Sequence, residues 1–353
     1  MGGGMKFLDL FAGIGGFRLG MESAGHECVG FCEIDKFARE SYKAIHNTEG
    51  EIELHDITTV TDEFIRGIGS VDIICGGFPC QAFSIAGNRR GFEDTRGTLF
   101  FEIARFASIL RPKYLFLENV KGLLNHQKGD TFETMLRALD ELGYDVEWQV
   151  LNSKNFGVPQ NRERVFIIGH LRGKCTRRVF PIERDVPKDN RKRNVEFVVP
   201  VLTPNRLEKR QNGRRFKTNG EPMFTLTAQD QHGILLQDKK LKIREATTKG
   251  YAEAGVGDSV NIANINSKTK RGRVGNQIAN TLLASEQQGV VGSDYRIRRL
   301  TPRECWRLQG FPDSAFDKAQ AVTSNSQLYK QAGNSVTVNI IAEIAKHFKE
   351  DEE

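Results

Sequence analysis

A cysteine, a glutamate and two arginines stand where they could act together on one substrate. Cys80 lies in Gly77-Phe78-Pro79-Cys80-Gln81, just after an apolar, β-branched run that predicts a buried strand. Glu118 ends a second such run, and Arg162 and Arg164 precede a third. In open α/β sheets, chemical groups gather at the ends of strands. The sequence therefore predicts a thiol, a carboxylate and two guanidinium groups at one sheet edge.

These four groups suit nucleophilic catalysis with help from an acid or base. A thiolate is a soft nucleophile, and nearby cations lower the pKa of a cysteine such as Cys80. Burial raises the pKa of a carboxyl group such as Glu118, so that it can hold or give up a proton during a reaction. Because Arg162 and Arg164 alternate by two, both would point to one face of a strand and could orient Glu118.

A short glycine-rich stretch marks a candidate cofactor site near the start of the chain. Phe11-Ala12-Gly13-Ile14-Gly15-Gly16 lies between a predicted strand and a predicted helix, where glycines let a ligand approach the backbone. The stretch does not match Gly-x-Gly-x-x-Gly. Glu33 lies twenty residues past Gly13, where nucleotide-binding sheets place an acid on ribose hydroxyl groups. The two features together predict a nucleotide-like cofactor.

With Gly333-Asn334-Ser335-Val336, these motifs closely resemble those of the DNA (cytosine-5)-methyltransferases. The resemblance spans both ends of the chain and fails in the middle. It implies an enzyme that transfers a methyl group from S-adenosylmethionine to carbon 5 of a flipped-out cytosine in a specific short sequence of double-stranded DNA. Cys80 would add to carbon 6, Glu118 would engage ring nitrogen 3, and Arg162 and Arg164 would orient Glu118 and contact the base or Cys80.

The resemblance also implies which residues hold the cofactor. Glu33 would bind the ribose hydroxyls, Asp56 the adenine amino group and Phe11 the adenosyl moiety. Because S-adenosylmethionine has no phosphate, a shortened glycine loop that cradles a carboxylate suits it better than a pyrophosphate loop. The full predicted set is Phe11, Gly13, Gly15, Gly16, Glu33, Ile34, Asp56, Ile57, Phe78, Leu99, Asn334 and Ser335.

Alternative functions differ in how many of these residues they use. A nicotinamide-dependent oxidoreductase would leave Cys80, Glu118 and the basic middle of the chain without roles. An RNA (tRNA) cytosine-5 methyltransferase and a non-catalytic DNA-binding relative remain open. A zinc deaminase is excluded, because its signature needs a second cysteine where this chain has Phe83, and a His-x-Glu that the chain lacks.

Contacts to DNA are expected from two parts of the chain. The stretch 81–97 combines glycines with arginines, which predicts a mobile lid that closes over the pocket and grips phosphates. Thr281-Leu282 resembles a pair that the family places near the backbone of the flipped nucleotide, although Thr225-Leu226 repeats it. Polar residues near 225–232 and 281–289 are candidates for reading bases. The predicted DNA-binding residues are Gln81, Arg89, Arg90, Arg96 and Thr281.

The distribution of charge also points to nucleic acid. Residues 171–300 contain 27 Lys and Arg against 13 Asp and Glu, a net charge of +14, whereas the rest of the chain carries −8. A basic middle on an acidic body favours a polyanionic partner, although a solvated basic surface is the alternative.

The chain contains no run of 18 apolar residues, so no membrane span is expected. The six cysteines form no Cys-x-x-Cys pair, which favours a reducing cytoplasm and argues against a structural zinc site.

The elements that must position these groups alternate along the chain. This alternation predicts an α/β fold with a doubly wound, mostly parallel, Rossmann-like sheet and a smaller, irregular, β-rich second domain. We expect a catalytic domain at 5–172, a DNA target-recognition domain at 173–300, and a return segment at 301–353 whose final helix packs on the catalytic domain. The expected partner is duplex DNA bound by a monomer, with a cognate restriction endonuclease as a possible separate partner. Strands are expected at 6–10, 28–32, 71–75, 114–118, 146–151 and 164–169, and helices at 15–24, 36–45, 98–109, 131–142, 302–308 and 337–349.

Overall fold

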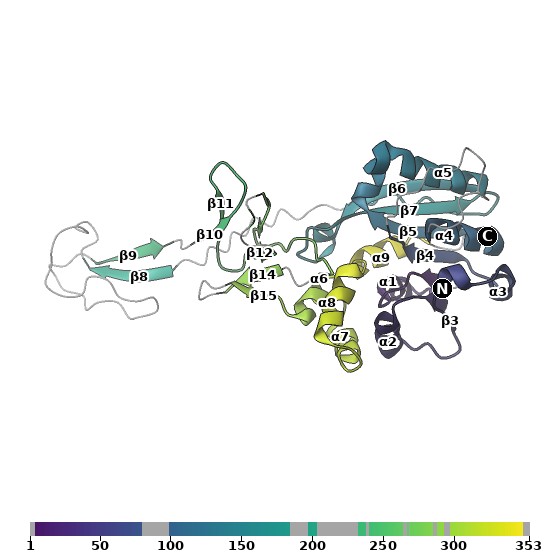
Figure 1. Cartoon of the computed structure of the whole chain (residues 1–353), viewed down its shortest axis with the longest axis horizontal. Coiled ribbons are helices and arrows are strands. Elements are labelled where there is room, and N and C mark those ends of the chain that lie inside the picture. The colour runs from purple at the N-terminus through teal and green to yellow at the C-terminus, as the bar shows by residue number, and fades with distance from the viewer. Residues whose placement is uncertain are drawn as a thin grey trace. The chain divides into compact units, whose positions relative to one another are not determined.

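The computed structural model of the chain describes residues 4–79, 99–183, 197–202, 232–237, 240–263, 267, 269–284, 288–292 and 297–348. The chain forms two compact units, whose elements are labelled in Figure 1. The first comprises Met1–Asp185, Ile278–Gln287 and Leu300–Glu353, and the second comprises Val186–Gln277 and Gln288–Arg299. The second unit thus begins later than the expected middle domain, and residues 278–287 belong to the first unit.

A seven-stranded sheet forms the centre of the first unit. Its strand order is β3-β2-β1-β4-β5-β7-β6. Neighbouring strands from β3 to β5 are parallel, whereas β7 runs antiparallel to both β5 and β6. The expected mostly parallel sheet is confirmed. The strands are β1 (Lys6–Leu10), β2 (Glu27–Cys32), β3 (Ile52–Leu54), β4 (Ile73–Gly77), β5 (Tyr114–Val120), β6 (Tyr144–Asn152) and β7 (Glu163–Leu171).

Some helices of the first unit begin at residues whose side chains cap the helix. Asp35 accepts hydrogen bonds from the first backbone N–H groups of α2, and Thr301 and Glu304 form a capping box at α6. The α-helices are α1 (Gly16–Ser23), α2 (Lys36–Ile45), α3 (Asp62–Gly67), α4 (Leu99–Leu110), α5 (Asp130–Glu141), α6 (Pro302–Leu308), α7 (Asp313–Gln320), α8 (Asn325–Asn334) and α9 (Val338–Ala345). Short 3-10 segments are η1 (Ile57–Thr59), η3 (Lys121–Gly129) and η4 (Ser153–Phe156).

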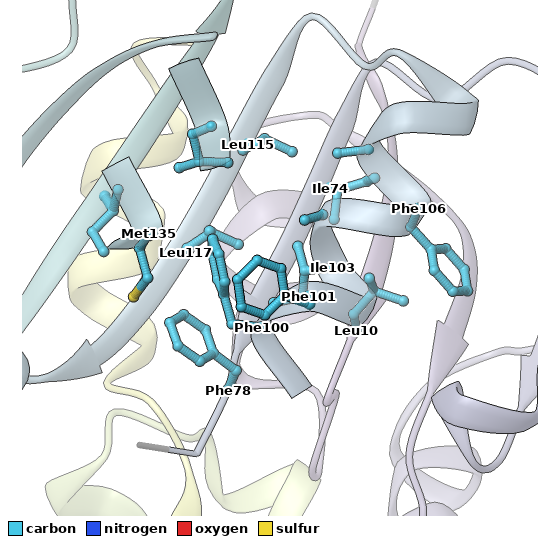
Figure 2. Close-up of a cluster of buried hydrophobic side chains, with 14 of the residues drawn as sticks. Leu10, Ile74, Phe78, Phe100, Phe101, Ile103, Phe106, Leu115, Leu117 and Met135 are labelled. Atoms are coloured by element: carbon cyan, nitrogen blue, oxygen red, sulfur yellow. The ribbon is translucent and has the colours of Figure 1, made fainter. Parts of the chain in front are cut away.

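The core of the first unit lies on both faces of the sheet, because alternate residues of each strand point to opposite sides. Leu115 and Leu117 of β5 pack with helices α4 and α5, and Figure 2 shows them near Phe101 and Met135. Phe116 lies between these two residues in sequence. It belongs to a second cluster of buried apolar side chains, which α1 and α9 cover. The sheet is therefore covered by helices on both faces, and α9 packs against α1.

The second unit contains only short antiparallel pairs in its described part. A small apolar cluster joins Ile243, Ala254, Val260 and Val291. This confirms the expected smaller, β-rich second part of the fold. Its strands are β8 (Phe197–Leu202) with β9 (His232–Gln237), β10 (Leu241–Arg244) with β11 (Tyr251–Ala254), and a sheet of β13 (Val274–Gly275), β12 (Ser259–Asn261), β14 (Gln288–Val291) and β15 (Ile297–Arg299).

No helix in the described part of the chain combines the length and the apolar character that crossing a membrane requires.

Candidate active site

A cavity of about 450 Å³ opens in the first unit at the ends of strands β1, β4 and β5. The strand order reverses between β1 and β4, and ligands of open α/β sheets bind at such a switch point. The cavity brings predicted catalytic and cofactor residues together. Its lining comprises Phe11, Gly13, Ile14, Glu33, Asp35, Ala38, Gly77, Phe78, Pro79, Glu118, Asn119, Val120, Arg162, Arg164, Gln327, Lys330, Gln331, Gly333, Asn334 and Ser335.

Glu118 lies near the end of β5 and is only 8% exposed. Nε of Arg164, from the neighbouring strand β7, lies 3.0 Å from its Oε1. Burial raises the pKa of the Glu118 carboxyl group above its ordinary value, while the charges of Arg164 and Arg162 act in the opposite direction. A carboxyl group under these opposed influences can take up or share a proton when a base arrives.

Gly77 at the end of β4 leaves room for this carboxylate. A Cβ atom at that position would lie 3.2 Å from Oε2 of Glu118, closer than most such contacts. A side chain at position 77 would therefore crowd the carboxylate.

Arg162 also lines the cavity, where the backbone holds its guanidinium group. Its guanidinium group is buried, with 3% of the residue exposed, and it donates to three backbone carbonyls, those of Leu282, Gly333 and Ser335. Burial and the neighbouring Arg164 charge lower its pKa to about 9. Of the two predicted arginines, Arg164 thus forms the ion pair with Glu118, while Arg162 is held by the backbone around the cavity.

Pro79 is the last described residue before position 80, and it lines the cavity beside Phe78. Asn119 is buried and donates from Nδ2 to the Phe78 carbonyl at 2.9 Å, so the backbone that leads to position 80 is fixed at the cavity wall. Five predicted residues lie outside the described part of the chain and stay predictions: Cys80, Gln81, Arg89, Arg90 and Arg96.

Glu33 joins the glycine loop to the cavity. Its Oε2 accepts the Gly13 N–H and its Oε1 accepts the Asp35 N–H, both at 2.8 Å. Each oxygen keeps a second lone pair that a ligand hydroxyl can use. Phe11, at the cavity wall, has φ of 56°, a left-handed conformation that costs a non-glycine residue about 1 kcal/mol or more. Such strain is common at ligand sites.

Six predicted cofactor residues do not line the cavity, and their roles stay predictions. Asp56 caps η1 and accepts the Thr58 N–H at 2.9 Å, and Ile57 is buried in the core. Ile34 is 68% exposed, and Leu99 begins α4.

The other two of the six, Gly15 and Gly16, lie at the start of α1, and Thr281 also does not line the cavity. Gly15 has φ of 83° and caps α1. A Cβ at Gly16 would lie 2.8 Å from Val336 Cγ2 and 2.9 Å from Ser335 Oγ, so this glycine lets α1 approach the segment after α8. Thr281 donates from Oγ1 to the Asn161 carbonyl at 2.7 Å.

One face of helix α8 lines the cavity, and most of its residues were not expected there from the sequence. Gln327, Lys330, Gln331 and Asn334 follow one another at helical spacing, and only Asn334 had been predicted. Lys330 forms an ion pair with Asp35 at 2.6 Å, which joins α8 to the start of α2. Polar residues spaced by three and four positions were the available signal, because this spacing puts them on one helix face.

Comparison with known proteins identifies the family of the chain. A family model for C-5 cytosine-specific DNA methylases matches residues 5–350. The chain belongs to this family. It is 38% identical to the type II methyltransferase M.HhaI of Haemophilus parahaemolyticus, over 97% of this chain and 93% of that one. It is 37% identical to the type II methyltransferase M.HpaII of Haemophilus parainfluenzae, over 98% of this chain and 89% of that one.

Solved structures show the same fold at lower identity. A mutant DNMT2 from Spodoptera frugiperda has a TM-score of 0.53 at 21% identity, covering 96% of this chain and 98% of that one. The methyltransferase EhMeth of Entamoeba histolytica has a TM-score of 0.54 at 17% identity, covering 98% and 97%. The family membership confirms the predicted enzyme class, a DNA (cytosine-5)-methyltransferase.

Proposed function

We propose that this protein transfers a methyl group from S-adenosylmethionine to carbon 5 of a flipped-out cytosine in a specific short sequence of double-stranded DNA, through a covalent adduct with Cys80. The observation that carries the proposal is that one cavity is lined by the Glu118–Arg164 ion pair, by the Glu33 loop and by Pro79. A proton-sharing carboxyl group, a candidate cofactor loop and the residue next to the proposed nucleophile thus surround the same space.

The residues at the cofactor end fit S-adenosylmethionine. The Glu33 carboxylate has lone pairs free for the ribose hydroxyls, and Phe11 and Phe78 give the cavity apolar walls for an adenine ring. The Glu33 carboxylate, which is held by two backbone N–H groups, also suits a ligand that carries a positive sulfonium centre. When bound, the cofactor supplies an electrophilic methyl group.

The protein's task is to make carbon 5 of cytosine nucleophilic. The Cys80 thiolate would form a bond to carbon 6, which moves the electron pair of the 5,6 double bond to carbon 5 while Glu118 stabilises ring nitrogen 3. Carbon 5 then takes the methyl group and loses its proton to a base. The carbon–sulfur bond breaks last, which restores the double bond and frees the thiolate.

Glu118 is suited to its part in this sequence because its proton affinity can change with the substrate. Burial favours the protonated carboxyl group, and Arg164 favours the carboxylate. A cytosine ring that gains electron density would draw the proton or hydrogen bond toward nitrogen 3. The ion pair also fixes the direction in which the carboxyl group points.

The substrate must leave the base stack to reach this cavity, at a cost of a few kcal/mol. The net charge of +14 on residues 171–300 supports a role of that region in holding DNA through its phosphates. As part of the proposal, Arg89, Arg90, Arg96 and Thr281 contact the DNA backbone and Gln81 supports the flipped base. We further propose that the enzyme acts as a monomer in the cytoplasm and that any restriction endonuclease of the same specificity acts separately.

The proposal can be tested by trapping the adduct. In a duplex that carries 5-fluorocytosine, carbon 5 has no proton to lose, so the carbon–sulfur bond persists after methyl transfer. We expect a denaturation-resistant protein–DNA complex with S-adenosylmethionine present, its loss in Cys80→Ser, and its retention in Cys175→Ser, which removes an exposed thiol. A complex that forms equally in Cys80→Ser would refute the role of Cys80, and trapping by substituted transfer RNA alone would indicate an RNA substrate.

A further inference from the structure

A short segment between two strands of the second unit belongs to the first unit. Residues 278–284, here called the strap, follow β13 and precede β14, and both of these strands lie in the second unit. The strap itself is part of the compact unit that contains the cavity.

Backbone hydrogen bonds join the strap to the residues just before β7. The Ala279 N–H donates to the Pro159 carbonyl at 2.7 Å, and the Asn161 N–H donates to the Ala279 carbonyl at 2.8 Å. Gln160 and Ala279 thereby form a parallel bridge. The Thr281 hydroxyl adds a bond to the Asn161 carbonyl at 2.7 Å. The strap is thus held in a fixed register.

The side chain of Gln160 holds the strap at Leu282. The residue is 0% exposed, and its Oε1 accepts the Leu282 N–H at 3.0 Å. Its Nε2 donates to the Leu308 carbonyl at the end of α6 at 2.8 Å and to Oε1 of Gln309 at 3.3 Å. Because a buried amide must satisfy both ends, the bonds of Nε2 fix the side chain and the bond of Oε1 determines where Leu282 can sit.

The peptide groups of Leu282 connect Gln160 to Arg162. The Leu282 N–H is bound by Gln160, and its carbonyl accepts from Nη1 of Arg162 at 3.2 Å. Nη2 of Arg162 donates to the Ser335 carbonyl at 2.7 Å. Gly333 lets the strap approach, since a Cβ there would lie 2.3 Å from the Leu283 carbonyl. The position of the Arg162 charge therefore depends on the strap.

We infer that Gln160 is a positioning residue for methyl transfer. By holding the Leu282 peptide it keeps Arg162 in place, and the Arg162 charge acts on the Glu118 carboxyl group. Chemistry is fast only when the strap is seated against residues 159–162. The inference rests on the proposed function, and it adds that the chain running to and from the second unit takes part in arranging the catalytic cavity.

The test compares two glutamines that each bind a backbone N–H and a backbone carbonyl. Gln160→Met keeps the size of the side chain but removes these backbone bonds and the bond to Gln309, whereas Gln149→Met removes a matching pair of backbone bonds to Ile182, at the sheet edge. We expect Gln160→Met to lower kcat at least about tenfold with cofactor Kd changed less than about threefold, and Gln149→Met to change neither. An unchanged kcat, or equal losses of kcat, cofactor affinity and Tm, would overturn the inference.

Gln160→Glu provides a rescue that depends on pH. A protonated glutamic acid can accept from Leu282 and donate to the Leu308 carbonyl, as glutamine does, but an ionised one repels that carbonyl. The ratio of kcat for Gln160→Glu to kcat for the wild type should therefore fall as pH rises. A ratio that does not change with pH would contradict the role of these two bonds.

Hydrogen exchange separates this inference from the proposed function, because it needs no activity. In Gln160→Met the amides of the strap should exchange at least about tenfold faster than in the wild type, while those of the Glu33 loop keep their rates. Equal strap exchange in both proteins would refute the positioning role even in an active enzyme. If the wild type transfers no methyl group but the strap amides still exchange faster in Gln160→Met, the result would support the role of Gln160 in holding the strap and refute the proposed methyl transfer.

Discussion

Arg164 reaches Glu118 across two neighbouring antiparallel strands, with Nε 3.0 Å from Oε1. In the register of β5 and β7, Arg164 lies opposite Val120, two residues from Glu118 and on the same face of the sheet. The pair places a cation beside a buried carboxyl group whose pKa burial would otherwise raise further. The proton affinity of Glu118 is thus set by the strand register.

Glu118→Gln should separate catalysis from binding. Glutamine keeps the shape of the side chain but cannot exchange a proton with ring nitrogen 3, so we expect kcat to fall at least about a hundredfold. Cofactor Kd, measured by titration calorimetry, should change less than about threefold, since the change removes no group from the Glu33 loop. Glu163→Gln, an exposed position at the start of β7, is the matched control. A Glu118→Gln enzyme with the wild-type rate would exclude this role.

Arg164→Met should destabilise the protein more at high pH than at low pH. Without the cation, the pKa of Glu118 in the folded state rises further above its unfolded value, so the associated stability is present at low pH and is lost as pH rises. We expect a loss of about 3 kcal/mol at about pH 8 and a smaller loss at about pH 5.5. Urea unfolding at both values measures it, and an equal loss at both would contradict the account.

His46 should make the fold sensitive to acid. Its ring is buried beneath the glycine loop, and burial and the Arg18 charge lower its pKa from 6.5 to about 3. The unfolded chain therefore binds a proton that the folded chain does not, and stability falls by up to about 1.4 kcal/mol per pH unit below 6.5. In His46→Asn this part of the slope should disappear in urea unfolding. An identical pH dependence in both proteins would refute it.

Gly16→Ala should weaken both the fold and the cofactor site. The added methyl group would lie under 3 Å from Val336 and Ser335, which forces α1 away from a segment that lines the cavity. We expect a loss of about 2 kcal/mol in the free energy of unfolding. The control is Gly67→Ala at the end of α3, where a Cβ has open space. If the two variants unfold alike, the close approach at Gly16 has no energetic consequence.

The sequence predicts the elements that carry strong periodicity. The apolar runs that became β1, β2, β4, β5 and β7 were expected, because buried strands need continuous apolar residues. Strand β6 was also expected, although it lies at the sheet edge and is only partly buried. Strand β3 was missed, since three residues are too few to show a period. Helix α3 was also missed, although Thr61 caps it, because its six residues hold little apolar pattern.

The part of the site that lies in motifs at strand ends could be predicted from the sequence. The part that is built by segments distant in the sequence could not. Glu118, Arg164 and Glu33 line one cavity, as their positions in the motifs suggested. The backbone anchoring of Arg162 depends on residues 282, 333 and 335, which local patterns cannot place beside residue 162. Long-range insertion of a short segment leaves no periodic signal in the sequence, because it follows from tertiary packing.

The most direct test of the central claim is transfer of a labelled methyl group from S-adenosylmethionine to a duplex DNA of mixed sequence, followed by bisulfite sequencing of the product. We predict label in the duplex and protected cytosines confined to one short motif, which would also define the specificity. Absence of label from DNA, with label in transfer RNA assayed in parallel, would contradict the account in favour of an RNA enzyme. Absence from both would indicate a DNA-binding protein without this activity.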